Sequence, residues 1–142
     1  MATISRLLDL GMKPYVLATA LEGVIAQRLV RKICEHCREP VESDARALAV
    51  LGNGFTPGTL KLFRGNGCEH CHGSGYSGRV GIYEVFLPDE GLRHLISSGA
   101  SIMEINRAAR EVGNTLLIDD ARSKVDMGLT TAEEVLRVLG PQ

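Results

Sequence analysis

The sequence has 142 residues, of which 44% are hydrophobic, and a formal net charge of -1. This length and apolar content are enough for one buried core with a helical appendage. The near-zero charge and the 4% aromatic content, without tryptophan, argue against a nucleic-acid partner. No long apolar run occurs, so we predict no transmembrane segment.

The first eleven residues, MATISRLLDLG, lack the apolar core of a signal peptide. We therefore expect a cytoplasmic protein. Thiols stay reduced in that compartment, which favours metal binding over disulfides wherever cysteines are paired by a short spacing.

The N-terminal part predicts two helices and a strand. Apolar residues at helical spacing between residues 4 and 8 predict a first helix that ends near Gly11. Pro14 suits the first turn of a second helix, whose apolar face would extend to Val24. The stretch 27–33 alternates in part between basic and apolar residues, which predicts a strand.

The middle of the chain predicts short elements separated by turns. Pro40 would end the turn that follows the first strand. A short helix over 43–51, capped by Ser and Asp, would come next. Alternation over 59–63 and β-branched and aromatic residues over 80–87 predict two further strands.

After Pro88 the apolar period becomes helical, beginning with a stripe over 92–96. Ser101 and Glu104 form a capping box, in which each side chain bonds the other residue's backbone N–H. This box would open a helix that ends at Gly113.

A further helix would run over 115–125 and end before Gly128. Thr131 and Glu134 repeat the capping-box pattern in front of a terminal helix. The last third therefore predicts a group of short amphipathic helices.

All four cysteines fall in two turns with the same spelling, CEHC. Two thiolates three positions apart can face one point from a tight turn, and two such turns complete a tetrahedron. The thirty residues between the pairs are tolerated, because loop-closure entropy grows only logarithmically with length. The spacing predicts a structural Zn²⁺ site whose ligands are Cys34, Cys37, Cys68 and Cys71.

Two alternatives to this ligand set stay open. The cysteines could be buried or disulfide-bonded, although such thiols have no reason to fall into two C-x-x-C pairs. A histidine could replace one of them, but with four thiols available we expect exposed loop positions for His36, His70 and His72. His94 lies alone on a predicted helix and carries no prediction.

Four protein ligands leave no open position for water, so the predicted site is structural and we assign no catalytic residue. A zinc ion with four thiolates has a formal charge of -2. We expect Arg31, Lys32, Arg38 and backbone N–H groups in the turns to offset this charge.

The segment GSGYSGRV, residues 73–80, fits two glycine-rich phosphate-loop patterns, but we predict no nucleotide site there. One pattern needs a strand before it and a helix after it, and the other needs kinase segments that the sequence lacks. The glycines are better explained by tight turns at positive φ.

We therefore predict an α+β fold with N-terminal helices, a small β-rich tetracysteine zinc unit and a C-terminal cluster of short amphipathic helices. The predicted boundaries are 1–33 for the first part, 34–87 for the zinc unit and 88–140 for the helical subdomain.

Three collinear blocks, 26–40, 67–85 and 116–138, resemble the C-terminal end of the ATPases that power type II secretion and type IV pilus assembly. The opening stretch 4–29 is similar to the region that follows the last nucleotide-site motif of that family. The resemblance implies that residues 1–33 are the end of the ATPase core and that the four cysteines are its zinc ligands.

The resemblance further implies a hexameric, cytoplasmic motor that is peripheral at the inner membrane. Its partners would be neighbouring ATPase subunits and inner-membrane platform proteins. ATP and Mg²⁺ would bind the parent protein through Walker A, Walker B and His-box segments, none of which occurs here. We therefore expect no ATP hydrolysis from this chain alone, and the sequence does not decide between secretion and pilus assembly.

Two other functions remain as alternatives. Residues 68–75 spell C-x-x-C-x-G-x-G, the repeat of the DnaJ-like zinc chaperones, but the first cysteine pair breaks that pattern. Such a module would hold two zinc ions instead of one. A nucleic-acid-binding zinc ribbon would show salt-dependent binding, which the charge and the few aromatics disfavour.

Overall fold

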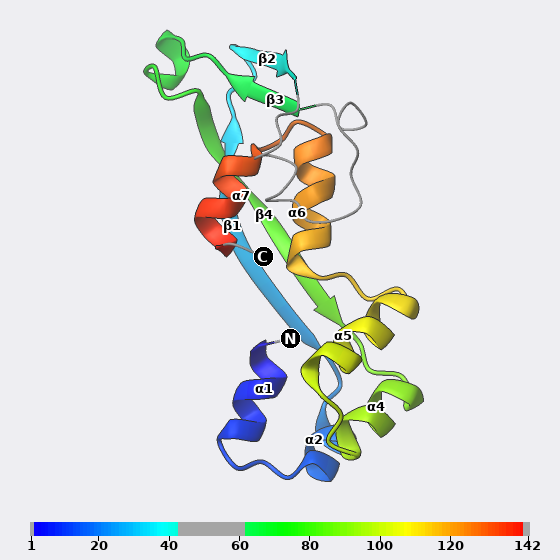
Figure 1. The fold of residues 1–142 in the computed structure, drawn as a ribbon. Coiled ribbons are helices and arrows are strands. Elements are labelled where there is room, and N and C mark those ends of the chain that lie inside the picture. The colour runs from blue at the N-terminus through cyan, green and yellow to red at the C-terminus, as the bar shows by residue number, and fades with distance from the viewer. Residues whose placement is uncertain (1, 43–61, 141–142) are drawn as a thin grey trace. The chain divides into compact units, whose positions relative to one another are not determined.

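The computed structural model describes residues 2–42 and 62–140 (Figure 1). The chain forms two compact units, each built from two separate segments: Met1–Ala26 with Tyr83–Leu117, and Gln27–Ile82 with Ile118–Gln142. The strands β1 (Val24–Ile33) and β4 (Tyr76–Phe86) pair with each other, and each contributes residues to both units. The α+β class is confirmed, whereas the predicted division at residues 33 and 87 stays a prediction.

The first unit contains α1 (Ala2–Asp9), α2 (Pro14–Ala20), α4 (Glu90–Ser97) and α5 (Ile102–Glu111). Each helix has one apolar stripe, and these stripes cover the ends of β1 and β4 that belong to this unit. The buried members of this core are Ile4, Leu17, Ala18, Val24, Phe86, Leu92, Ile96, Ile105 and Ala109.

The second predicted helix is shorter than expected, and its predicted extension to Val24 is wrong. α2 ends at Ala20, and Val24 is the first residue of β1. Gly23 disfavours continuation of the helix, and Val24 is buried in the extended strand as well as it would be in a helix. The Arg93 guanidinium donates a hydrogen bond to the free carbonyl of Ala18, 2.7 Å away, at the last turn of α2.

The capping box at Ser101 is confirmed. The Ser101 hydroxyl accepts a bond from the Glu104 N–H, and the Glu104 carboxylate accepts one from the Ser101 N–H at 2.8 Å. At the other end of α5, Gly113 has a φ of 86° and follows the C-cap Val112. This is the left-handed position that ends many helices.

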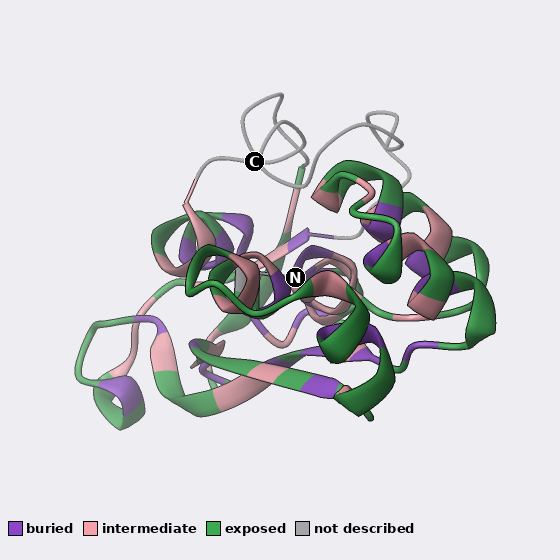
Figure 2. Cartoon of the chain, turned by 90° about the horizontal axis from the view of Figure 1, so that it is seen from below, coloured by how far each residue is buried: buried purple, intermediate pink, exposed green. Residues whose placement is uncertain are grey.

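The second unit contains β2 (Arg38–Val41), β3 (Leu62–Gly65), most of α6 (Leu117–Asp126) and α7 (Ala132–Leu139). β2 and β3 pair antiparallel, with Arg38 opposite Gly65 and Val41 opposite Leu62. Besides Cys34 and Cys71, the buried apolar residues in the described part of this unit are Val30, Ile33, Leu62, Ile82, Ile118, Ala121, Val125, Ala132 and Val135. α6 and α7 each carry buried and exposed residues, and Figure 2 shows how the buried and exposed residues are distributed along the chain.

Several predictions for the middle of the chain change in the structure. Pro40 does not end the cysteine turn but lies inside β2, opposite Phe63, where a two-stranded sheet tolerates a residue without an N–H. β4 begins at Tyr76 and not at Val80, because pairing with β1 extends the strand. The helix predicted over 43–51 and the first part of the strand over 59–63 lie outside the described residues.

No helix in the described part of the chain is both long enough and apolar enough to cross a membrane.

Candidate metal centre

The first cysteine turn follows β1 directly. β1 ends at Ile33, and the N–H of Cys37 donates to the carbonyl of Cys34 at 3.3 Å, which closes the turn before β2 begins. Two bonds join this turn to the second half of the site. The Cys34 N–H donates to the Gly75 carbonyl, and the Asn66 N–H donates to the Cys37 carbonyl, both at 3.0 Å.

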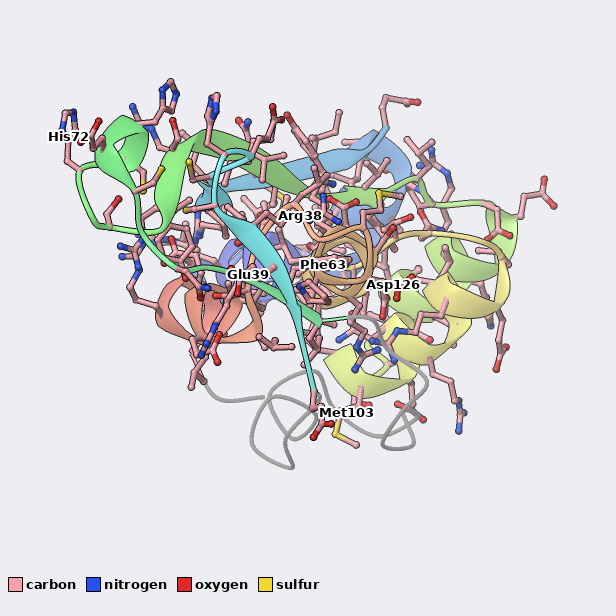
Figure 3. All side chains as sticks on the ribbon, turned by 90° about the horizontal axis from the view of Figure 1, so that it is seen from above. Arg38, Glu39, Phe63, His72, Met103 and Asp126 are labelled. Atoms are coloured by element: carbon pink, nitrogen blue, oxygen red, sulfur yellow. The ribbon has the colours of Figure 1, made fainter. Side chains whose placement is uncertain are left out.

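The second cysteine turn is a single 3₁₀ turn, η1 (Glu69–Cys71), with Cys68 at its N-cap. The sulfur of Cys71 accepts hydrogen bonds from two backbone N–H groups, that of Cys68 at 3.2 Å and that of Gly75 at 3.3 Å. His72 ends the turn in the left-handed region, with a φ of 50°, and lies at its outer edge (Figure 3).

The two turns bring the four predicted ligands together. Their sulfur atoms all lie within 4.8 Å of one another, and three of the Sγ–Sγ separations are 3.7, 3.8 and 3.9 Å. A tetrahedral zinc ion with Zn–S bonds of about 2.3 Å places its sulfurs about 3.8 Å apart. The four thiols are free and not disulfide-bonded, and Cys34 and Cys71 are buried. The donor set and its dimensions therefore fit a closed tetrathiolate site.

The thiols differ in how readily they ionise. Burial, together with hydrogen bonds with the other three thiols, raises the pKa of Cys37 to about 12 and outweighs the lowering effect of a backbone hydrogen bond at Gly67. Burial also acts to raise the pKa of Cys71, but the N–H donors of Cys68 and Gly75 and the neighbouring thiols outweigh it and lower that pKa to about 6. Backbone donors at Cys71 therefore stabilise a thiolate, which is the form that binds a metal.

The basic residues near the first turn make contacts away from the sulfurs. Arg31 pairs with Glu134, and Lys32 pairs with Glu35 at 2.6 Å. Arg38 lies over the Phe63 ring at 3.8 Å (Figure 3). The backbone N–H donors that we expected at the sulfurs are present at Cys71. The expected role of the three cations in offsetting the charge of a zinc centre stays a prediction.

The histidines lie outside the sulfur cluster, as predicted. His36, His70 and His72 are exposed, and no histidine joins the one metal-type cluster found among the described residues. The rings of His36 and His70 lie 4.0 Å apart between centroids, a contact that we did not predict. The signal was present in the sequence, because both histidines occupy the same position of two turns with the same spelling.

The glycine-rich segment after the second turn forms no helix N-terminus. It leads into β4, and Gly73, Gly75 and Gly78 all have φ values between 74° and 76°. The prediction of tight turns at positive φ is therefore confirmed, and the strand that follows does not fit the dinucleotide-binding pattern.

The fold and the site define an α+β protein in which two C-x-x-C turns bring four cysteines together. The chain belongs to the type II/IV secretion system protein family, whose sequence pattern matches residues 1–137.

Individual relatives come from both secretion and pilus systems. Over 95% of its length the chain is 46% identical to the type II secretion system protein E of Pseudomonas aeruginosa. It is 43% identical, over 94% of its length, to the type IV pilus assembly ATPase PilB of Thermus thermophilus. It is also 39% identical, over 95%, to the type II secretion system ATPase E of Vibrio cholerae. The chain spans only 26%, 15% and 26% of these relatives, respectively.

Proposed function

We propose that this chain is the zinc-bearing C-terminal portion of a hexameric traffic ATPase that powers type II protein secretion or type IV pilus assembly. The observation that carries the proposal is the match to the family over residues 1–137, combined with the tetracysteine cluster that lies within it. The secretion and pilus ATPases among the relatives support the general role.

Within this proposal, Cys34, Cys37, Cys68 and Cys71 hold one structural Zn²⁺ in the unit 34–87. The ion would join the turn after β1 to the turn before β4 and would leave no position for a substrate. Structural zinc sites contribute roughly 10–16 kcal/mol to the folding of finger peptides, more than the net stability of many domains. The fold of this region would therefore depend on the ion.

The activity and partners of the whole motor are also part of the proposal. ATP and Mg²⁺ would be bound by the parent protein, which would act in the cytoplasm, peripheral at the inner membrane. Neighbouring subunits and inner-membrane platform proteins would be its partners. This chain would transmit movement and would not hydrolyse ATP.

Metal analysis of the purified, reduced chain tests the central claim. We expect one zinc ion per chain, and replacement of both Cys34 and Cys68 by serine should remove the ion and lower the melting temperature. Two zinc ions per chain would favour the DnaJ-like alternative, and no bound metal would refute both. ATP turnover by this chain above background would contradict the proposal that this chain does not hydrolyse ATP.

A further inference from the structure

Glu134 is a buried acid near the start of α7 that bonds to β1. The residue is 1% exposed, and its carboxylate accepts bonds from the backbone N–H and the Nε of Arg31, both at 2.9 Å. Arg137, one turn later on the same helix, adds two bonds at 2.8 and 2.6 Å. Burial raises the pKa of Glu134, but bonds from Arg137 and Arg31 outweigh it and lower the pKa to about 2. The carboxylate is therefore ionised, and both of its oxygens accept hydrogen bonds.

The capping box predicted from Thr131 and Glu134 is only half formed, because the Glu134 carboxylate bonds to arginines instead. The Thr131 hydroxyl accepts a bond from the Glu134 N–H at 3.2 Å, as a capping residue should. The Glu134 carboxylate does not complete the box, because it faces Arg31 and Arg137 instead.

Tyr76, the first residue of β4, closes the network. Its hydroxyl lies 2.8 Å from the Thr131 hydroxyl, and the Arg31 guanidinium lies over its ring at 4.2 Å from the centroid. These contacts form a closed ring of four residues, which we call the α7 clamp: Arg31, Tyr76, Thr131 and Glu134. It joins the start of α7 to both β1 and β4.

On the β1 side, the clamp holds the residues that lead into the first cysteine turn. Arg31 lies three residues before Cys34, and its carbonyl accepts a bond from the Thr130 hydroxyl at 2.9 Å. The Ile33 N–H donates to the carbonyl of Leu129, also at 2.9 Å. The chain just before α7 therefore follows the last residues of β1.

On the β4 side, the clamp holds the residue that follows the second cysteine turn. Tyr76 comes directly after Gly75, whose N–H donates to the Cys71 sulfur and whose carbonyl accepts from the Cys34 N–H. One cluster therefore fixes the backbone next to both halves of the metal centre.

We infer that Glu134 is a positioning residue for the metal centre, and that ion binding and the docking of α7 are thermodynamically coupled through the α7 clamp. This inference rests on the proposed zinc site. Two turns held in their bound arrangement lose less conformational freedom when the ion binds, so the clamp raises the affinity. Linkage is reciprocal, so the ion also stabilises the docked helix. A partner that pulls on α7 would weaken the metal centre.

Cobalt(II) and zinc titrations of the full chain, with a competing chelator, test the coupling. The comparison is between wild type, Glu134→Gln and the control Glu133→Gln, which changes an exposed residue of the same helix turn. We expect one tetrathiolate cobalt spectrum in all three proteins. The affinity should fall at least tenfold in Glu134→Gln and less than twofold in Glu133→Gln. Equal affinities in wild type and Glu134→Gln would overturn the inference while leaving the proposed zinc site intact, whereas no metal binding by wild type would overturn both.

A milder variant and a second measurement cover the case in which Glu134→Gln fails to fold. Tyr76→Phe removes one hydroxyl of the clamp, keeps the ring under Arg31, and should lower the zinc affinity about threefold. Removal of the ion from wild type should speed amide hydrogen exchange at Val135 far more than at Ala109, which lies in the other unit. Unchanged affinity in Tyr76→Phe, or equal effects at the two amides, would contradict the inference.

Discussion

Gly65 and Gly75 lie in direct backbone contact where β3 ends and the glycine-rich segment returns past it. A Cβ atom on Gly65 would lie 2.0 Å from the carbonyl oxygen of Gly75, and one on Gly75 would lie 2.4 Å from that of Gly65. A Cβ on Gly67 would lie 2.7 Å from the carbonyl oxygen of Gly73. The backbone segments before and after the second cysteine turn therefore lie so close together that only glycine fits at these positions.

Gly65→Ala should damage the metal centre without touching a ligand. The new methyl group would meet rigid backbone, so the two segments must separate, at a cost of about 3 kcal/mol or more. Because the carbonyl of Gly75 also accepts from the Cys34 N–H, zinc affinity should fall as well. Urea unfolding and chelator competition measure the two effects.

Gly91→Ala is the matched control for this substitution. A Cβ on Gly91, in α4, would be 3.5 Å from the nearest atom, which is ordinary contact. Alanine favours a helix, so this variant should be neutral or more stable by up to about 1 kcal/mol. If Gly65→Ala proved equally well tolerated, the close backbone contact would be wrong.

His72→Gly should stabilise the protein. A non-glycine residue in the left-handed region costs roughly 1–2 kcal/mol, and part of that cost is offset by the greater freedom of glycine in the unfolded chain. We therefore expect a net gain of about 0.5–1 kcal/mol in thermal or urea unfolding. His72→Ala keeps the unfavourable φ and should give no gain; a gain of the same size in that variant would assign the effect to loss of the imidazole.

The charge of Glu134 should make the free energy of unfolding depend on pH and fall at low pH. Its pKa is about 2 in the folded protein against an ordinary value of 4.5, so its contribution is complete above pH 4.5 and is lost as the pH falls towards 2. The shift corresponds to about 3 kcal/mol as an upper bound, because Arg31 and Arg137 are half exposed.

Unfolding of wild type and Glu134→Gln over a series of pH values measures this effect. The stability difference between the two proteins should be constant from pH 8 to about 5.5 and should shrink between about 4.5 and 2. Because Glu134→Gln is also expected to bind zinc more weakly, the zinc content of both proteins is measured at each pH, and the difference is taken only where the two contents are equal. A difference that does not change with pH would show that the charge is not what matters.

Ser101→Ala should destabilise the first unit. The hydroxyl caps α5 by accepting the Glu104 N–H, and loss of such a cap costs about 1 kcal/mol. Ser97→Ala, at the exposed end of α4, should change the stability by less than about 0.5 kcal/mol. Thermal unfolding of the two variants decides whether the cap contributes as expected.

Local patterns predicted much of the fold. The capping box at Ser101, the C-terminal positions of Gly113 and Gly128, and the strand leading to Cys34 depend on neighbouring residues in the chain, so short-range rules were sufficient. The place of Pro40 was missed because the pairing of β2 with β3 decided it. The end of α2 was placed too late although Gly23 was a local sign of it.

The sequence by itself determined the composition of the candidate site, because the spacing of two thiols in a tight turn is a local property. The structure brings the sulfurs of Cys34, Cys37, Cys68 and Cys71 within 4.8 Å of one another, and their role as zinc ligands stays a proposal. The same sequence blocks were enough to indicate the family that the comparisons establish.

Only the tertiary structure decided what Glu134 does. In the sequence it completes a capping box with Thr131, but a carboxylate accepts bonds from whichever donors are near. Folding brings Arg31 to it across 103 positions of sequence. The stronger, charge-assisted bonds win over the neutral N–H of Thr131, and no pattern within a single helix contains that competition.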